Sequence, residues 1–178
     1  MAGGGAKTLK IQLMLAKCVA GHEANGAPAN DDVSSKSKKS EIFYKGDGSR
    51  FEVDTTIKLN VNTSYQLSMN FRPVVRIERM QIMGDIKSPS EAARNIESVT
   101  YTTFFDTKTK QASKKGKRDK IHIFIDLGEH GTLNLILQAK YYAEKDDNHV
   151  AWGNLLHHIE FEATSSEGEV KVSKILFR

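Results

Sequence analysis

The residue types that could support catalysis are present, but not in an arrangement that catalysis requires. The chain has one cysteine, Cys18, which lies within or at the end of an apolar strand. Burial at the end of a strand would raise the pKa of this thiol, whereas a nucleophilic cysteine must be a thiolate. The sequence contains no Gly-x-Ser-x-Gly motif of the kind that presents a nucleophilic serine. We therefore predict that the protein is not an enzyme.

Histidine side chains could bind a metal ion, but their spacing argues against a shared site. His157 and His158 are adjacent, and neighbouring side chains on a strand point to opposite faces of the sheet, so one ion cannot reach both. His122, His130 and His149 are scattered, without cysteine partners or the helical His-x-x-x-His spacing. We expect neither a metal nor another cofactor.

A lysine-rich stretch, residues 107–120, is the most strongly charged part of the chain, with a net charge of +6. Such a run usually forms a solvated loop, but at an anionic bilayer each charge contributes about 1 kcal/mol. Nucleic-acid binding is less expected, because no aromatic residues alternate with the cationic ones to stack on bases. The candidates for steering an acidic partner or for contacting an anionic membrane are Lys110, Lys114, Lys115, Lys117 and Arg118.

Aromatic residues on both sides of an Asp-Gly pair form a second candidate region. Asp47-Gly48 is typical of a tight turn, and the flanking aromatics would then pair across a β-hairpin. A packed hairpin explains these residues without any partner, and partner binding is the alternative. The only tryptophan, Trp152, precedes Gly153 and would anchor a core or cap a cavity. The candidate partner-binding residues are Phe43, Tyr44, Lys45, Arg50, Phe51 and Trp152.

Alternation of apolar and polar residues dominates the sequence and predicts the elements that position these side chains. A period of two is typical of half-buried strands. Residues 88–96 are an exception, where Ser88 as a cap and Pro89 at the first position favour a short helix. Eight or more strands with short connections predict an all-β, antiparallel β-sandwich or barrel. The clearest alternating runs are residues 9–15, 65–71, 99–105, 121–127, 133–141, 157–163 and 170–177.

Length and composition limit the class of protein. A chain of 178 residues fits a single domain, residues 1–178. Residues 20–40, rich in small and polar side chains, predict a long flexible insertion near the N-terminus, and residues 107–120 predict a lysine-rich loop. One cysteine permits no internal disulfide, and no apolar run approaches the roughly 20 residues of a membrane span. Together these features predict a cytoplasmic protein. The formal net charge of the chain is +4.

The same residues carry a resemblance to a known family. The segments Phe43-Tyr44-Lys45-x-Asp47-Gly48-x-Arg50-Phe51 and Thr56-Ile57-Lys58-Leu59 resemble those of the cannabinoid receptor-interacting protein family. The resemblance covers about residues 8–163, whereas the 20–40 insertion and the residues after Thr164 depart from the family pattern. Matching segments that follow in the same order are Tyr101-Thr102, Gly131-Thr132, Gln138-x-Lys140-Tyr141-Tyr142, Trp152-Gly153 and Ile159-Glu160-x-Glu162.

This resemblance implies a non-enzymatic intracellular adaptor. Its expected partner is the cytoplasmic C-terminal tail of a G-protein-coupled receptor of the cannabinoid-receptor kind, whose signalling it would modulate. The resemblance also implies a β-barrel or sandwich similar to the Rho GDP-dissociation inhibitors. The expected location is the cytoplasm, at the inner face of the plasma membrane when a partner is bound.

Two modes of binding remain open at this point. In the first, the tail adds as a strand to an exposed sheet edge, with Phe43, Tyr44 and Arg50 in contact. In the second, the sheets separate and enclose the acyl or prenyl chain of a lipidated G-protein tail, which requires an apolar cavity. The plentiful Leu, Ile and Phe side chains suit such a cavity and a filled core equally well.

Overall fold

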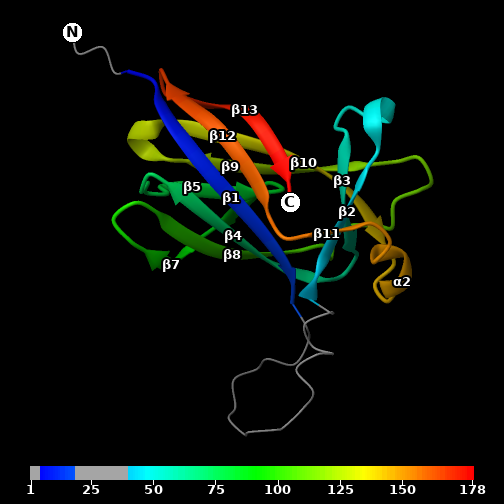
Figure 1. Cartoon of the computed structure of the whole chain (residues 1–178). Helices are drawn as coiled ribbons and strands as arrows, with labels where there is room; N and C mark the ends of the chain where they lie inside the picture. Colours follow the sequence, from blue (N-terminus) through cyan, green and yellow to red (C-terminus); the bar gives the residue numbers. More distant parts are fainter. Residues whose placement is uncertain (1–4, 19–39) are drawn as a thin grey trace, which may run out of the picture.

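The computed structural model describes residues 5–18 and 40–178, and nearly all of the predicted 20–40 insertion lies outside these residues (Figure 1). The helical segments in the described part are short: α2 (Asp147–Val150) and two 3-10 turns, Gly48–Arg50 and Gly128–His130. The described strands are β1 (Lys7–Lys17), β2 (Ile42–Gly46), β3 (Thr55–Asn60), β4 (Ser64–Arg72), β5 (Arg79–Ile82), β6 (Asp85–Lys87), β7 (Ser90–Arg94), β8 (Val99–Asp106), β9 (Asp119–Asp126), β10 (Thr132–Tyr142), β11 (Asn154–Leu156), β12 (Ile159–Ser166) and β13 (Glu169–Phe177).

Alternation in the sequence becomes alternation in burial. In β1 the apolar side chains from Leu9 to Leu15 are buried at every second position, and the residues between them are exposed. Each of the seven alternating runs forms a strand, although β12 starts at Ile159, two residues later than its run. The all-β prediction is therefore confirmed.

The short helix predicted for residues 88–96 is wrong. Ser90–Arg94 form β7, which pairs with β8 antiparallel and contains an irregularity between Glu91 and Ala93. All five residues of β7 are exposed, so a helix here would have no apolar face to bury. Because isolated short helices are marginal, pairing with β8 provides the better partners for these backbone groups.

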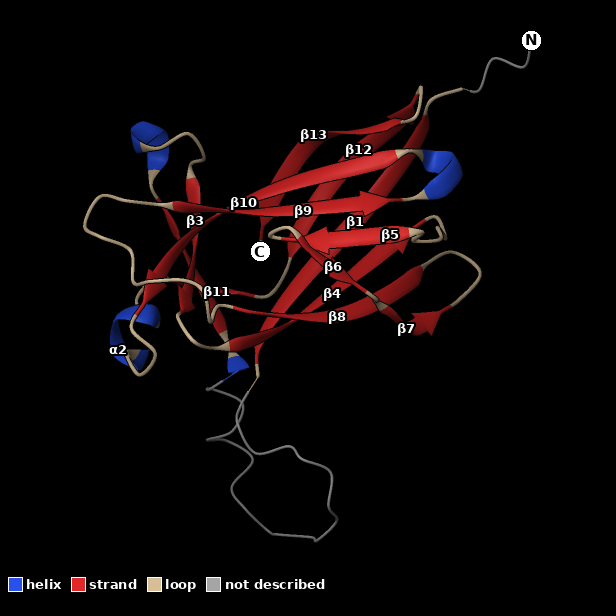
Figure 2. Ribbon diagram, turned by 180° about the vertical axis from the view of Figure 1, so that it is seen from behind, coloured by secondary structure: helices blue, strands red, loops and turns tan. Residues whose placement is uncertain are grey.

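The strands form one curled sheet whose two parts face each other across the core. One part has the order β7-β8-β4-β1-β12-β13, and the other has the order β11-β2-β3-β10-β9-β5-β6. Figures 1 and 2, taken from opposite sides, show β1 and β12 lying across from β9 and β5. Buried side chains from both parts, among them Ile11, Phe161 and Ile123, share one hydrophobic cluster.

Strand β10 joins the two parts and makes the only parallel pairings among the described strands. It pairs with β13 over two positions, Thr132 and Leu133, and with β3 from Gln138 onward. At the first junction Gly131 has φ +94°, and a Cβ there would lie 2.3 Å from the carbonyl carbon of Gly168. Only glycine permits this approach. Between the two junctions, residues 134–137 of β10 pair with β9 on one side and with no described strand on the other.

Candidate functional site

The first candidate site is the opening beside residues 134–137 of β10, where β13 and β3 diverge, called here the β10 opening. It is a pocket of about 280 Å³. The rings of Tyr44 and Phe177 form one wall, with their centroids 5.4 Å apart. Ile136 and Ile175 also line it and are 44% and 47% exposed. Apolar side chains thus surround a strand edge that has no partner in the described chain.

The base of the β10 opening belongs to the core. Leu137 lines the opening and is 3% exposed as a member of the hydrophobic cluster. Along β10 the odd-numbered side chains point into the core and Asn134 and Ile136 point outward. The opening is therefore a surface groove that ends on packed core side chains.

The second candidate site is a cationic pocket of about 250 Å³, called here the lysine pocket and defined by Lys45, Lys58, Lys140 and Arg118. Strand register produces it. Lys58 on β3 stands directly opposite Lys140 on β10, and Lys45 on β2 pairs with the neighbouring Thr56. Like charges directly opposite each other destabilise a sheet, so this arrangement costs stability.

Lys58 is the most buried of these cations, at 6% exposure. Its ammonium group donates hydrogen bonds to the carbonyl oxygens of His149, at 3.1 Å, and of Trp152, and lies 5.5 Å from the ring centroid of Tyr142. Burial lowers the pKa of Lys58, and the charges of Lys45, Lys140 and Arg118 lower it further. The ammonium of Lys140 lies 4.9 Å from the same Tyr142 ring, and burial and neighbouring cations lower its pKa too.

Asp47 supplies the one carboxylate that pairs with the lysine pocket in the described chain. Its side chain is 2% exposed and accepts two hydrogen bonds from Arg118, at 3.1 and 3.2 Å. Burial would raise the pKa of Asp47, but hydrogen bonds from Arg118 and Thr56 and the charges of Arg118 and Lys45 outweigh it, so the pKa is lowered. Four cations against one carboxylate leave a net charge of +3 in the pocket.

The aromatic hairpin differs from its prediction. Asp47 has φ −102° and ψ −2°, whereas the tight turn typical of Asp-Gly requires positive φ at both central residues. The connection between β2 and β3 therefore runs from Asp47 to Asp54 and includes a 3-10 turn. Phe43 faces Lys58 instead of an aromatic partner, and Phe51 lies in the connection under Arg118, 4.3 Å from its guanidinium carbon.

Trp152 lies at the rim of the lysine pocket and is 67% exposed, so it caps this pocket and does not anchor the core. Its ring meets that of His149 edge to face at 4.9 Å. The next residue, Gly153, lets this segment approach β2 closely, because a Cβ at this residue would lie 2.5 Å from the carbonyl oxygen of Tyr44. Asp146 fixes His149 by accepting hydrogen bonds from its backbone and its ring.

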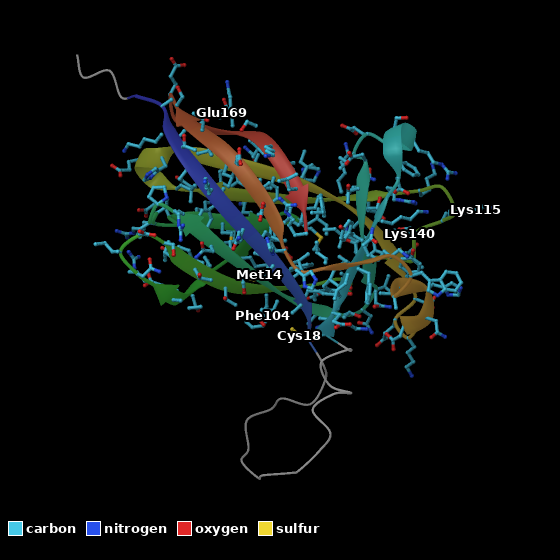
Figure 3. All side chains as sticks on the ribbon, in the orientation of Figure 1. Met14, Cys18, Phe104, Lys115, Lys140 and Glu169 are labelled. Atoms are coloured by element: carbon cyan, nitrogen blue, oxygen red, sulfur yellow. The ribbon has the colours of Figure 1, made fainter. Side chains whose placement is uncertain are left out.

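The lysine-rich stretch forms the connection between β8 and β9. Lys114, Lys115 and Lys117 are exposed on it, and Figure 3 shows Lys115 at its outer end and Lys140 beside β3. Lys110 lies 5.8 Å from the ring of Tyr141. Arg118 differs from the expected surface cation, because its side chain is only 9% exposed and points at Asp47.

The predicted partner-binding residues thus separate into distinct places. Tyr44 lies in the β10 opening, and Lys45 and Trp152 lie in the lysine pocket, together with Arg118, which was predicted as a steering cation. Arg50 lies on the 3-10 turn, 5.7 Å from the Phe51 ring. Sequence reasoning missed Lys58 and Lys140 in the pocket, and in the opening it missed Ile136, Ile175 and Phe177.

Several features bear on the chemistry predicted from the sequence. Burial raises the pKa of the Cys18 thiol, as predicted. Residues 5–18 and 40–178 contain no group of three or more His, Cys, Asp or Glu residues that could hold a metal ion. No helix among these residues has the length and apolar character needed to cross a membrane.

Comparison with known proteins adds an independent observation. Residues 32–177 match the family model described as CB1 cannabinoid receptor-interacting protein 1. The chain is 32% identical over 130 residues to the CB1 cannabinoid receptor-interacting protein 1 of Rattus norvegicus and 31% identical over 132 residues to that of Homo sapiens. Each alignment covers 71% of this chain and 79% of the relative.

Proposed function

Because the chain belongs to the CB1 cannabinoid receptor-interacting protein 1 family, we propose that it is a non-enzymatic adaptor that binds the cytoplasmic C-terminal tail of a G-protein-coupled receptor and modulates its signalling. The names of its relatives support a cannabinoid-like receptor as the partner. The adaptor works in the cytoplasm and, when bound to a tail, at the inner face of the plasma membrane.

The unpaired edge of β10 is the observation that carries the binding mode. An extended peptide in the β10 opening gains main-chain hydrogen bonds from residues 134–137, which have no partner on that side among the described strands. Strand addition of this kind derives affinity from the backbone and specificity from pockets for alternate side chains. Tyr44, Phe177 and Ile175 supply such an apolar pocket. At about 3.3 Å per residue the edge accommodates roughly four residues of the tail.

Of the three residues expected to contact the tail, Tyr44 alone lines the opening. Phe43 lines a different pocket, together with Lys17 and Lys58. Arg50 is exposed on the 3-10 turn. The proposal therefore places the tail against Tyr44 and β10 and assigns Phe43 and Arg50 no direct contact.

A fluorescent receptor-tail peptide, titrated with the protein and followed by polarisation, tests this proposal. Ile136→Arg introduces a charge into the opening and is expected to weaken binding at least tenfold. Ile86→Arg is the matched control, because Ile86 is 70% exposed on β6 outside the opening, and it should bind like the unaltered chain. A tail with alternate residues N-methylated should also lose binding. Equal affinity for the two variants, or retention of no tail above a scrambled peptide, refutes the proposal.

A lipid chaperone for lipidated G-protein tails is the second candidate, and one observation favours it. Because Leu137 at the base of the opening belongs to the core, an acyl or prenyl chain that enters there meets apolar side chains at once. It must displace some of them, since they are packed. Lipidated and unlipidated forms of one tail separate the candidates: binding of both supports strand addition, and binding of the lipidated form alone supports the chaperone.

A further inference from the structure

We propose that the lysine pocket is a binding site for a phosphate monoester, carried either by a soluble inositol phosphate or by the headgroup of a phosphoinositide lipid. This site is separate from the β10 opening, since the two share none of their lining residues. The proposal therefore adds to the function proposed above and does not depend on it.

Uncompensated charge is the first argument. Asp47 forms a two-pronged ion pair with Arg118 and lies 3.7 Å from Lys45. Within the described residues, Lys58 and Lys140 have no carboxylate partner; Lys58 binds backbone carbonyls, and both lie over the Tyr142 ring. A phosphate monoester carries close to two negative charges at neutral pH, which would neutralise most of the surplus.

Strand register is the second argument. Lys58 and Lys140 stand directly opposite each other on β3 and β10. The charge of Lys45 on β2 lowers the pKa of both, so all three ammonium groups repel one another. A structural role explains Lys58 in part, because its ammonium donates hydrogen bonds to the carbonyl oxygens of His149, within α2, and of Trp152, just after it. That role leaves Lys140 unexplained and leaves Lys45 with a 3.7 Å ion pair to Asp47, and both lysines line the same pocket. An anion between the three ammonium groups relieves their repulsion.

The shape of the lysine pocket suits a phosphate that is attached to a larger group. Its volume of about 250 Å³ is roughly eight times the ≈30 Å³ that a water molecule occupies in the liquid. A phosphate fills only part of that space. The exposed ring of Trp152 and the ring of His149 form the rim, where they can pack against the sugar ring or alcohol that carries the phosphate.

The charge of the site depends on the titratable groups that surround it. The titratable groups around it are the four cations, Asp47, Tyr142, His149 and its partner Asp146. Burial and neighbouring cations lower the pKa of Lys58 and Lys140, so a bound anion raises both values again.

The exposed Lys114, Lys115 and Lys117 precede Arg118 on the same connection, and they would meet an anionic bilayer around a headgroup held in the pocket.

Trp152 gives a direct readout, because it is the only tryptophan and lies at the rim. Its fluorescence is followed while the protein is titrated with inorganic phosphate, with inositol 1,4,5-trisphosphate, and with phosphatidylcholine vesicles that contain phosphatidylinositol 4,5-bisphosphate. Saturable quenching or enhancement by the soluble compound identifies a soluble ligand. A response to the phosphoinositide vesicles alone identifies a headgroup. No response to any of the three overturns the proposal.

Matched variants show whether the response belongs to the pocket. Lys140→Gln removes one pocket cation and is expected to weaken binding at least tenfold. Lys171→Gln removes the same charge from β13, where Lys171 is 75% exposed, and should change binding less than twofold. A Lys45→Gln variant, altered at a 53% exposed side chain, repeats the test at a position where folding is least affected. Equal affinities for the pocket variants and the control, or equal binding to phosphatidylserine vesicles, refute a specific site.

Discussion

Replacement of Asp47 by alanine tests the charge balance of the lysine pocket most directly. Asp47 and Arg118 are 2% and 9% exposed and form two hydrogen bonds, and loss of one partner leaves the other charge buried. Removing one member of a buried ion pair costs about 3–5 kcal/mol. Because the pocket opens to solvent, we expect the lower limit, about 3 kcal/mol, in the free energy of unfolding measured with urea. The same change raises the net charge of the pocket, so phosphate should bind more tightly to the folded variant.

A double-mutant cycle separates pairing from other effects of the substitution. The Asp47→Ala and Arg118→Met double variant should lose less stability than the sum of the two single variants, with a coupling of about 2 kcal/mol. Glu52→Ala is the control, since Glu52 pairs with Lys120 at the surface and is 74% exposed, and its effect should be small. Additive losses, or equal effects of Asp47→Ala and Glu52→Ala, would show that the buried pair does not organise the pocket.

Three further predictions concern pH, the junction of the two sheet parts and the thiol. The pKa of Asp47 is lower in the folded protein than its unfolded value of about 3.9. The ionised carboxylate therefore stabilises the fold fully above the unfolded pKa, and this stabilisation is lost as the pH falls through the folded pKa. In urea titrations at acid pH, the difference in unfolding free energy between the unaltered chain and Asp47→Ala should shrink. Gly131→Ala should destabilise by more than about 2 kcal/mol in urea, combining positive φ with a clash at Gly168, whereas Gly84→Ala, at φ +89° with open space, isolates the conformational cost. Cys18, whose pKa burial raises, should react with iodoacetamide at pH 7.5 more slowly in the folded protein than in urea, and equal rates would contradict its burial.

The alternation of apolar and polar residues predicted the strands, because burial of one face of a sheet imposes a period of two on the sequence. Leu133, Leu135 and Leu137 point into the core as their spacing requires. The helix predicted for residues 88–96 was wrong because capping residues report only on the local sequence. The pairing of Ser90–Arg94 with β8 is a tertiary contact. The prediction of a tight turn at Asp47-Gly48 was wrong for the same reason, since Arg118, 71 residues away, binds the carboxylate of Asp47.

The candidate sites depend on strand neighbours that are distant in sequence. Lys58 and Lys140 become a pair only through the parallel register of β3 and β10, and alternation carries no information about which strands are adjacent. Lys58 carried no local signal, because a lysine between Ile57 and Leu59 fits ordinary alternation and would be expected on the exposed face. The family resemblance included both lysines but assigned them no role.

The edge of β13 on the β10 side, which borders the β10 opening, has a consequence for the behaviour of the protein at high concentration. Beyond Val170 this edge has no partner among the described strands, and free strand edges promote stacking of identical chains into fibrils. Charged Lys171 and Lys174 lie along β13, and an irregularity in its pairing with β12, between Glu162 and Ala163, makes the strand irregular. Both features hinder edge-to-edge polymerisation. The chain can thus keep an edge available for a foreign strand while it resists joining copies of itself.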